Sequence, residues 1–211
     1  MLDLIIIGAG SAGISAYKEA RKYTHNLRII NDGAWDTTCA RVGCMPSKIL
    51  VSTANRLHDA HHADRVGLNL QIEADTSRVM THLRALRDRF TRSVIRDVDS
   101  WNPEHKISGK AKFINANTIE VNGEQLQAKA FILAVGSTPR FDQGDQKALG
   151  DRLISTDDIF ELPDLPKRLA VIGSGAIAIE LSQAMHNLGV EVTTFARSRH
   201  VVILSSDNLQ N

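Results

Sequence analysis

Two cysteines, Cys39 and Cys44, stand five positions apart, and the chain of 211 residues contains no others. On a regular helix this spacing is a rise of about 7.5 Å, which exceeds the ~7 Å that a disulfide bridges without backbone movement. A disulfide would therefore need a distorted turn, which Gly43 permits and Pro46, by removing a helical donor, favours. Because helix N-termini and nearby cations lower a thiol pKa, and Lys48 follows Cys44 by one turn, we expect the pair to favour the thiolate.

The cysteine pair has two other interpretations, namely two buried free thiols or half of a zinc site. Zinc sites of this kind use C-x-x-C spacing and a second cysteine pair, and the sequence has neither. His58, His61 and His62 fall at helical spacing, but without supporting ligands they fit a solvated helix face better than a metal centre. The sequence therefore predicts redox chemistry at the cysteines and no metal site.

A glycine-rich turn occurs twice, as GAGSAG at residues 8–13 and as GSGAIA at residues 173–178. Each turn follows a continuous apolar run, typical of a buried parallel strand, and precedes a helical segment and a second strand. The stretches Gly8–Ile30 and Gly173–Phe195, from the first glycine to the end of the second strand, have the same length. Such turns let backbone N–H groups approach a pyrophosphate. Their repetition predicts two dinucleotide sites, against the alternative of turns without a ligand.

The residue that follows the second strand of such a unit bears on the choice of nucleotide, because an acidic side chain there binds a ribose hydroxyl. The first copy has Asn31 and then Asp32, whereas the second has Ala196, Arg197 and, two residues on, Arg199. The exchange of an acid for arginines favours a 2′-phosphate, hence NADP slightly over NAD. Solvated surface arginines are the alternative interpretation.

The elements that must position these groups follow from apolar periodicity. We expect helices at about residues 46–62 and 76–98, and a β meander of short strands over residues 106–135 with a hairpin at Asn122-Gly123. The long helix should bury one face, made of Val79, Leu83, Leu86, Phe90, Val94 and Val98.

The predicted fold class is α/β, with two Rossmann-like domains. Residues 1–150 would form the first domain, with inserted helices and the meander. Residues 151–211 would form the start of the second domain, reached through a linker at residues 163–166.

Composition excludes several classes of protein. The chain has 25 Lys and Arg against 24 Asp and Glu, and this net charge of +1 argues against a general nucleic-acid or anionic-membrane binder. Hydrophobic residues make up 43% of the chain, enough for a core. No apolar run approaches the roughly 18 residues of a membrane span. The N-terminus lacks the basic region of a signal peptide, so we expect a cytoplasmic protein.

Together these motifs resemble the class I pyridine nucleotide–disulfide oxidoreductases, which include dihydrolipoamide dehydrogenase, glutathione reductase and mercuric reductase. The resemblance runs from Leu4 through the rest of the chain. Four segments carry it, namely the two glycine turns, TCARVGCMPSK at residues 38–48 and AVGSTP at residues 134–139. The cysteine segment is the most specific of them. The resemblance implies that residues 1–150 form a Rossmann-like FAD-binding domain and that residues 151–211 form the truncated start of an NAD(P)-binding domain.

The resemblance implies that electrons pass between NAD(P)H, FAD, a Cys39–Cys44 disulfide and a small disulfide or dithiol substrate, as in a dihydrolipoamide dehydrogenase. Cys39 would exchange with the substrate, and Cys44 would sit against the flavin. Lys48 would lie near flavin N5 and pair with Glu180. The positions implied to contact FAD are Gly8, Gly10, Ser11, Ala12, Gly13, Asn31 or Asp32, Thr38, Cys44, Lys48, Ala111, Ala134, Val135 and Gly136. Those implied to contact the nicotinamide nucleotide are Gly173, Gly175, Ala176, Ile177, Glu180 and Arg197.

Three features depart from the family pattern. Asp36 and Thr37 stand where a pair of glycines usually precedes the cysteines, and Asn31 replaces the usual acid. Members of the family are also much longer, with a C-terminal domain that forms the homodimer and carries a His-Glu acid–base pair. We therefore expect the chain to be a fragment or truncated product that exposes apolar surface where further elements pack. A non-catalytic flavin-binding or interaction module and a flavin-free thiol redox sensor are the alternative functions.

Overall fold

The computed structural model describes residues 1–196, which divide into two compact units. Unit 1 combines Met1–Met45 with Arg87–Asp157, and unit 2 combines Pro46–Leu86 with the described residues from Asp158 onward. These bounds differ from the expected division at residue 150, because Pro46–Leu86 groups with the C-terminal segment, to which Ser47, Lys48 and Arg84 donate hydrogen bonds. Which nucleotide each part of the chain binds stays a prediction.

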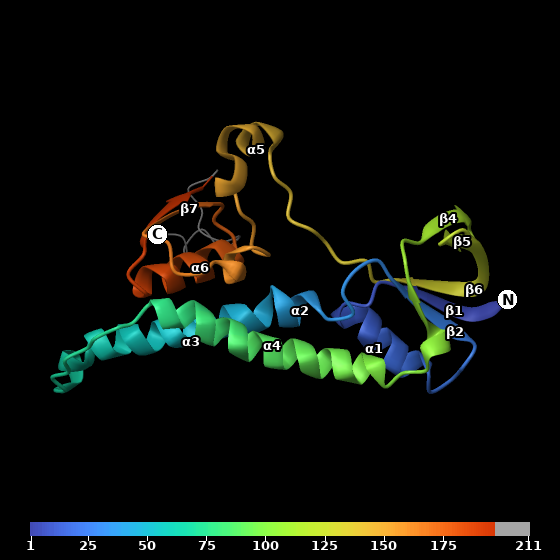
Figure 1. The fold of residues 1–211 in the computed structure, drawn as a ribbon, viewed down its shortest axis with the longest axis horizontal. Coiled ribbons are helices and arrows are strands. Elements are labelled where there is room, and N and C mark those ends of the chain that lie inside the picture. Colours follow the sequence, from blue (N-terminus) through green and yellow to red (C-terminus); the bar gives the residue numbers. More distant parts are fainter. Residues whose placement is uncertain (197–211) are drawn as a thin grey trace, which may run out of the picture. The chain divides into compact units, whose positions relative to one another are not determined.

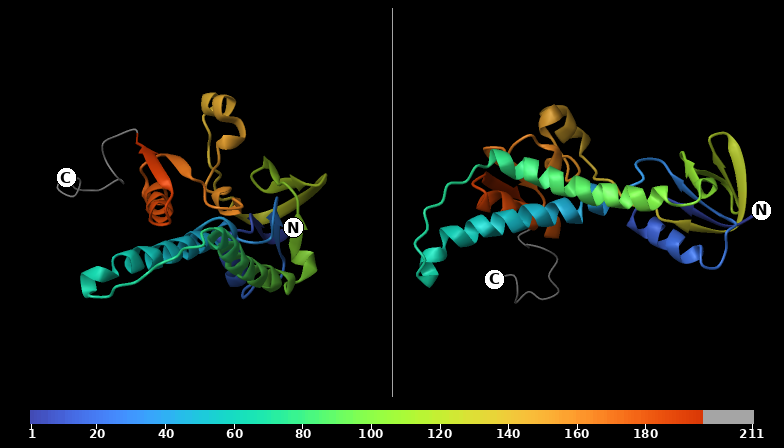
Figure 2. Two further views of the ribbon diagram at one scale, coloured as in Figure 1. Left: turned by 60° about the vertical axis from the view of Figure 1, so that its left-hand side comes forward. Right: turned by 60° about the horizontal axis from the view of Figure 1, so that its bottom comes forward.

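Unit 1 is built on one six-stranded sheet. Its strands are β1 (Leu2–Ile7), β2 (Leu27–Asn31), β3 (Lys106–Ser108), β4 (Lys112–Asn115), β5 (Thr118–Val121) and β6 (Glu124–Leu133). They lie in the order β3-β2-β1-β6-β5-β4, with β1, β2, β3 and the end of β6 parallel (Figure 1). The start of β6 pairs antiparallel with β5, and β5 with β4, and β6 bends between the two arrangements (Figure 2). The α/β class and the Rossmann-like sheet with a meander are therefore confirmed.

Helix α1 (Ser11–Ala20) connects β1 to β2 and packs against the sheet (Figure 1). Because successive strand residues face opposite sides of a sheet, Ile6 packs with Ile14 and Tyr17 of α1, whereas Ile5 packs with Ile119 in a second cluster. All five side chains are at most 8% exposed. The end of β1, where the first glycine turn begins, is thus held from both faces.

The hairpin between β5 and β6 forms at Asn122-Gly123, as predicted. Asn122 has φ 53° and Gly123 has φ 82°, which is the left-handed backbone of a type I′ turn. Val121 pairs with Glu124 across the turn, so this dipeptide sets the register of the meander.

The segment between β2 and β3 is mostly helical. It contains α2 (Thr38–Arg41), α3 (Cys44–His61), a 3₁₀ turn (Ala63–Val66), α4 (Ser77–Asp99) and a second 3₁₀ turn (Pro103–His105). Helices α3 and α4 lie within two residues of the predicted helices at 46–62 and 76–98.

The predicted buried face of α4 is correct in part. Leu83 and Val98 are buried, and Val79, Leu86 and Val94 are half-buried. Phe90, however, is 42% exposed, and Arg87 and Thr91, which are 7% and 9% exposed, join the buried stripe. Arg87 Nε lies 2.9 Å from Asp88 Oδ1, and the Thr91 hydroxyl donates to the Arg87 carbonyl. Polar side chains with satisfied hydrogen bonds can occupy a buried stripe, and apolar periodicity does not reveal them.

Unit 2 contains the second βαβ unit, formed by β7 (Arg168–Ile172), α6 (Ala176–Asn187) and β8 (Glu191–Phe195), with β7 and β8 parallel. A 3₁₀ turn (Ile159–Glu161) precedes it in unit 2, and residues 163–166, the expected linker, form neither helix nor strand. Unit 1 further contains α5 (Gln143–Leu149) and a 3₁₀ turn (Gly150–Arg152). Among residues 1–196 there is no helix with the length and apolarity needed to cross a membrane.

Candidate functional site

The first glycine turn joins β1 to α1 and leaves no room for side chains at two of its glycines. Gly8 has φ +104°, and a Cβ there would lie 2.1 Å from the Ala134 carbonyl oxygen. A Cβ on Gly13 would lie 1.8 Å from the Gly8 carbonyl oxygen, so this glycine lets the helix approach the strand. At Gly10, by contrast, a Cβ would meet no heavy atom of the described chain within 4 Å.

The open space at Gly10 lies at the N-terminus of α1. Gly10 is the N-cap, the described residues supply no capping side chain, and the first turn carries no acidic residue. The N–H groups of Ser11, Ala12 and Gly13 therefore lack helical partners, and together with the helix dipole they form a site for an anion. The pyrophosphate of FAD fits this arrangement.

Asn31, expected at the adenosine ribose, is engaged in hydrogen bonds within the protein. Its Oδ1 accepts from the Ala9 N–H at 2.9 Å, and its Nδ2 donates to the carbonyls of Gly33 and Ala34 at 3.1 and 2.9 Å. The Asn31 amide thus ties the glycine turn to the segment that leads to the cysteines. The neighbouring Asp32 is exposed and offers a carboxylate to a ribose hydroxyl.

Other positions expected at FAD lie near the turn in unit 1. The Ala134 N–H donates to the Ile7 carbonyl at 2.8 Å and places Val135 and Gly136 just beyond the end of β6. Val135 is 70% exposed, and Gly136 has φ +67°. Ala111 is half-buried between β3 and β4.

The second glycine turn repeats the hydrogen bonds of the first. The Gly173 N–H donates to the Phe195 carbonyl at 2.8 Å, as Gly8 does to the end of β2 at 2.7 Å. Gly175 is the N-cap of α6, again without a side-chain cap from the described part of the chain. A Cβ on Gly173 would lie 3.9 Å from the Ala178 Cβ, so the second turn accepts alanine at the third glycine position.

The remaining nucleotide positions of the second turn are only partly described. Ala176 and Ile177 are exposed in the first turn of α6, and Ala196 is exposed after β8. Arg197 and Arg199 lie outside the described residues, so the preference for NADP stays a prediction.

The helix is interrupted between Cys39 and Cys44. The sequence spacing predicted such a break, because two cysteines five positions apart on a regular helix are too far apart for a disulfide. Val42 ends α2 with φ −133°, and α3 begins at Cys44. Both cysteines are free thiols, with Cys39 half-buried and Cys44 exposed. Gly43 packs tightly, because a Cβ there would lie 3.0 Å from the Thr38 carbonyl oxygen and 3.1 Å from the Cys39 Cα.

Pro46 plays a different part from the one expected. It is the third residue of α3, where a backbone N–H has no helical partner and its loss costs nothing. The distortion between the cysteines therefore comes from Val42 and Gly43, and Pro46 is simply compatible with the start of α3.

The expected activation of the thiol pair is wrong for Cys39. A hydrogen bond with the Cys44 thiol, burial and the charge of a Cys44 thiolate all raise the pKa of Cys39. The backbone N–H groups of Cys44 and Met45 lower this pKa, as a helix N-terminus should, but they do not prevail. A thiolate beside a second sulfur is disfavoured by like charge, which sequence spacing did not reveal.

The two residues that replace the glycine pair hold α2 in place. Thr37 is its N-cap, with Oγ1 accepting from the Ala40 N–H at 3.0 Å. Asp36, 8% exposed, accepts from Arg41 Nε through Oδ1 at 3.2 Å. Both contacts span the turn that carries Cys39. Asp36 and Thr37, which replace the usual glycine pair, therefore help to orient Cys39. A threonine just before a short helix was the signal that sequence reasoning missed.

Lys48 and Glu180 meet within unit 2. Lys48 Nζ lies 2.5 Å from Glu180 Oε2, and the Ser47 hydroxyl donates to Glu180 Oε1. The hydrogen bonds from Lys48 and Ser47 lower the pKa of Glu180. Ser47 was not expected at the site, and its place beside Lys48 in the first turn of α3 is the signal that could have found it.

His58 and His61 lie in the last turn of α3, and His62 follows the helix directly. His62 Nδ1 lies 2.7 Å from the His58 carbonyl oxygen, and the two rings are 4.2 Å apart. Within residues 1–196, no three His, Cys, Asp or Glu side chains gather in a way that could hold a metal ion.

Comparison with known proteins matches almost the whole chain to one family. A family model described as pyridine nucleotide-disulphide oxidoreductase matches residues 2–209. A mercuric reductase of Lysinibacillus sphaericus is 37% identical over 202 residues, which are 95% of this chain and 37% of that protein. A dihydrolipoyl dehydrogenase of Geobacillus stearothermophilus is 31% identical over 196 residues, which are 90% of this chain and 41% of that protein. The chain thus spans less than half the length of these curated relatives.

A solved structure shares the fold. It is a Cu(II) complex of RclA, an HOCl-induced flavoprotein disulfide reductase from Escherichia coli, and its TM-score is 0.78 at 18% identity. The match covers 99% of this chain and 45% of that one. At this identity the likeness concerns the fold, which agrees with the Rossmann-like architecture.

Proposed function

Since the chain belongs to the pyridine nucleotide-disulphide oxidoreductase family, we propose that it takes part in electron transfer between NAD(P)H, FAD, the Cys39–Cys44 pair and a small disulfide or dithiol. One observation carries the proposal. Unit 1 places two free thiols, Cys39 and Cys44, and an uncapped glycine turn in one compact body, with Asn31 joining the turn to the cysteine segment.

The thiol chemistry follows from the two free thiols of the cysteine segment. In the reductive direction the Cys39 thiolate attacks one sulfur of the substrate disulfide, which forms a mixed disulfide and releases one substrate thiolate. The Cys44 thiolate then attacks the Cys39 sulfur, which closes the Cys39–Cys44 disulfide and releases the second substrate thiolate. Protons from the two cysteine thiols leave with the products. When bound, FAD supplies the relay that brings two electrons from NAD(P)H to reopen this disulfide.

Lys48, Ser47 and Glu180 support the flavin side of this scheme. The Glu180 carboxylate fixes the Lys48 ammonium, while Ser47 holds its other oxygen. Lys48 follows Cys44 by one turn of α3, so the Glu180 contact fixes an ammonium group one helical turn from the cysteine expected at the flavin.

Mercuric ion is a second candidate substrate, because the relatives named mercuric reductase are more similar in sequence than those named dihydrolipoyl dehydrogenase. Two adjacent thiolates are soft ligands that suit a soft metal ion. Its reduction would consume the same two electrons that would otherwise open a disulfide.

A non-catalytic flavin-binding module is the alternative function, because the chain spans 37% of one relative and 41% of another. Such a module would hold FAD at the glycine turn without turning over a disulfide. For the whole protein we expect the homodimer of the family and NADP slightly ahead of NAD.

Reconstitution with FAD tests the proposal. The chain should take up FAD and turn yellow, and two-electron reduction by dithionite should add a long-wavelength absorbance band from Cys44 against the flavin. Cys44→Ser should abolish the band. Cys39→Ser, the matched control, should show the band already before reduction, because its Cys44 has no disulfide partner and stays a free thiol beside the oxidised flavin. A colourless chain that takes up no FAD would contradict the proposal. FAD uptake with a band that both variants retain would favour the non-catalytic module.

A further inference from the structure

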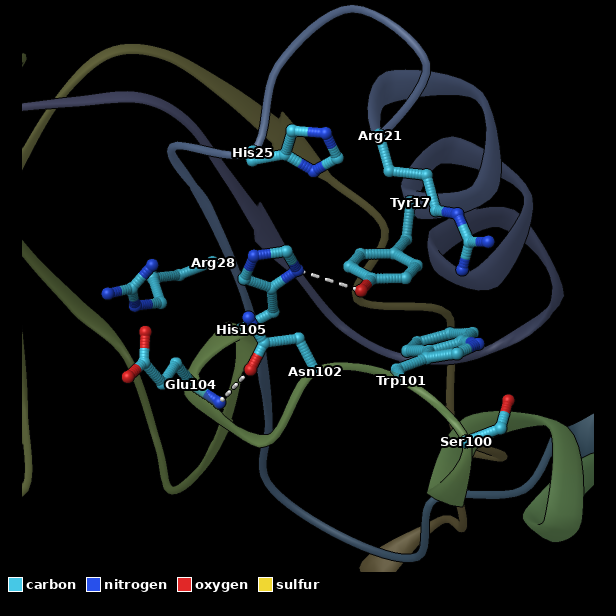
Figure 3. A pocket seen from close by; sticks show the side chains of 9 residues that line it. All are labelled: Tyr17, Arg21, His25, Arg28, Ser100, Trp101, Asn102, Glu104 and His105. Carbon is cyan, nitrogen blue, oxygen red and sulfur yellow. Dashed lines mark hydrogen bonds between the residues drawn. The ribbon is translucent and has the colours of Figure 1, made fainter.

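The two tryptophans of the chain are held in different ways. Trp101 is 3% exposed and stacks on Tyr17 with ring centroids 4.0 Å apart, as Figure 3 shows. Trp35 lies between β2 and α2, is half-buried, and packs against the same core cluster. Its indole Nε1 also donates to Ser108 Oγ at 2.9 Å. Because an indole N–H is only a donor, this bond fixes the direction of the Trp35 ring, which apolar packing alone does not.

Ser108, the last residue of β3, is a fixed point of unit 1. It pairs with Asn31 in the register of β2 and β3, and the Gly109 N–H donates to the Asn31 carbonyl at 2.9 Å. The Ser108 carbonyl accepts from Asn122 Nδ2 at 2.9 Å. Asn122 also packs on Gly109, where a Cβ would lie 2.4 Å from the Asn122 Oδ1. The acceptor of the Trp35 bond is therefore held by a strand and by a hairpin.

The Trp35 bond attaches the turn that carries Cys39 to the sheet. Asp36 accepts from Arg41, and Thr37 caps α2. Both contacts stay within this turn, so they shape it without attaching it to a strand. The bond from Trp35, the residue directly before Asp36, joins groups 73 positions apart in the sequence and reaches β3.

The few residues between β2 and Trp35 are also held. Asn31 Nδ2 donates to the carbonyls of Gly33 and Ala34 at 3.1 and 2.9 Å, and Asn31 Oδ1 accepts from the Ala9 N–H of the glycine turn at 2.9 Å. Trp35 follows Ala34 directly. The Asn31 bonds and the Trp35 bond thus hold both ends of the segment that leads from the glycine turn to the cysteines.

We propose that Trp35 is a positioning residue for thiol exchange at Cys39, and that its hydrogen bond to Ser108 anchors the turn that carries Cys39 on the sheet. This inference rests on the proposed function, in which Cys39 exchanges with the substrate disulfide. Cys39 is half-buried, so a side chain that holds its turn also sets how much of the thiol a substrate reaches. Loss of the bond loosens the turn and exposes Cys39.

Alkylation of the reduced 211-residue chain by iodoacetamide, without FAD, tests the anchor. Trp35→Phe keeps an apolar ring but removes the indole N–H, and Ser108→Ala removes the acceptor. Each variant should raise the alkylation rate of Cys39 about threefold, because the turn opens more often without this hydrogen bond. The double variant should react no faster than either single variant, because both substitutions remove the same bond. Peptide mass spectrometry measures each cysteine separately.

The pH dependence of the same reaction gives a second readout. The hydrogen bond with Cys44 and burial both raise the pKa of Cys39. A loosened turn weakens both causes, so the midpoint of Cys39 alkylation should move to lower pH in Trp35→Phe and in Ser108→Ala. A residue that only contributes to the stability of unit 1 would leave this midpoint unchanged.

Two controls separate a loosened turn from lost folding. Cys44 is already exposed, so its alkylation rate should stay nearly unchanged in every variant. Ser100→Ala removes a hydroxyl that donates to the Asp97 carbonyl at 2.6 Å, elsewhere in unit 1, and should leave the rate of Cys39 unchanged.

Three results would overturn the proposal. They are a wild-type rate for Cys39 in both single variants, an equal acceleration of Cys44, and rate increases that multiply in the double variant. Uptake of FAD is measured on the same proteins. A chain that takes up no FAD while Cys39 responds as expected would contradict the proposed function and leave the anchor established.

Discussion

At the scale of single residues, the glycines of the first turn are needed for two different reasons, close packing and ligand access. Gly13 is required by packing, because a Cβ there would overlap the Gly8 carbonyl, whereas Gly10 borders open space at the N-terminus of α1. A glycine that no packing contact explains points to a ligand that approaches the backbone. The two positions therefore separate stability from cofactor binding.

Alanine at each glycine tests this separation. Gly13→Ala should destabilise the chain by about 2 kcal/mol or more, because the helix must move away from the strand. Gly10→Ala should unfold like the wild type yet lose FAD, because its methyl group enters the space of the pyrophosphate. Urea unfolding without FAD and flavin retention on gel filtration measure the two effects. Gly10→Ala with unchanged FAD affinity would show that the cofactor does not approach this turn.

The second residue-scale prediction concerns Cys39, whose pKa is raised chiefly by its hydrogen bond with Cys44. Its alkylation by iodoacetamide, followed by peptide mass spectrometry across pH, should have a midpoint above that of an ordinary thiol. Cys44→Ala removes the main cause, so the midpoint should move to lower pH. Cys44→Ser keeps a hydrogen-bonding hydroxyl and should move it less. Equal midpoints in all three proteins would mean that the two sulfurs are not in contact.

At the scale of elements, helix α3 carries both a cysteine of the redox pair and the lysine that binds Glu180. Its first residue is Cys44, and one turn later Ser47 and Lys48 bind Glu180 of α6. Lys48 is 65% exposed and Glu180 31% exposed, so water screens the pair. The contact therefore matters more for where it holds the ammonium than for how much it stabilises unit 2.

Removal of the Glu180 carboxylate should lower the free energy of unfolding slightly, by an amount that depends on pH. The pKa of Glu180 is lowered in the folded chain, so its contribution is present above the unfolded value near 4.5 and fades as pH falls through the folded value. Glu180→Gln should lower the free energy of unfolding by at most about 1 kcal/mol at pH 7. The loss should shrink as the pH falls through the lowered pKa. Urea unfolding over a series of pH values below 7 measures it, with the exposed Glu191→Gln as control, and a loss that stays constant over the series would contradict this account.

At the scale of the whole molecule, the described chain leaves large apolar side chains on its surface. Ile172 and Phe195 are partners across β7 and β8, and they are 63% and 57% exposed. Adjacent apolar side chains of this kind normally mark a surface that something else covers.

A hydrophobic dye should report this patch. The double variant Ile172→Gln with Phe195→Gln should lower the fluorescence of bound ANS severalfold, because it replaces both members of the pair. Tyr23→Gln, at a side chain that is 82% exposed in unit 1, should leave the fluorescence unchanged. If the double variant binds as much dye as the wild type, the patch is not accessible in solution.

Sequence alone determined the features that depend on local chemistry. The glycine turns, the Asn122-Gly123 hairpin and the ends of α3 and α4 follow from backbone preferences and apolar periodicity, which act over a few residues. Only the tertiary structure decided which residues complete the buried face of α4, because hydrogen-bonded Arg87 and Thr91 enter the stripe while Phe90 stays exposed.

The same division holds within the candidate site. The spacing of Cys39 and Cys44 predicted a break in the helix, but the rise of the Cys39 pKa depends on how close the two sulfurs come. Asn31, Asp36 and Thr37 looked like departures from a pattern, and their hydrogen bonds made them positioning residues. Backbone preferences depend on residues that are close in sequence, so they can be predicted from the sequence. A thiol pKa and a buried hydrogen bond depend on residues that only folding brings together.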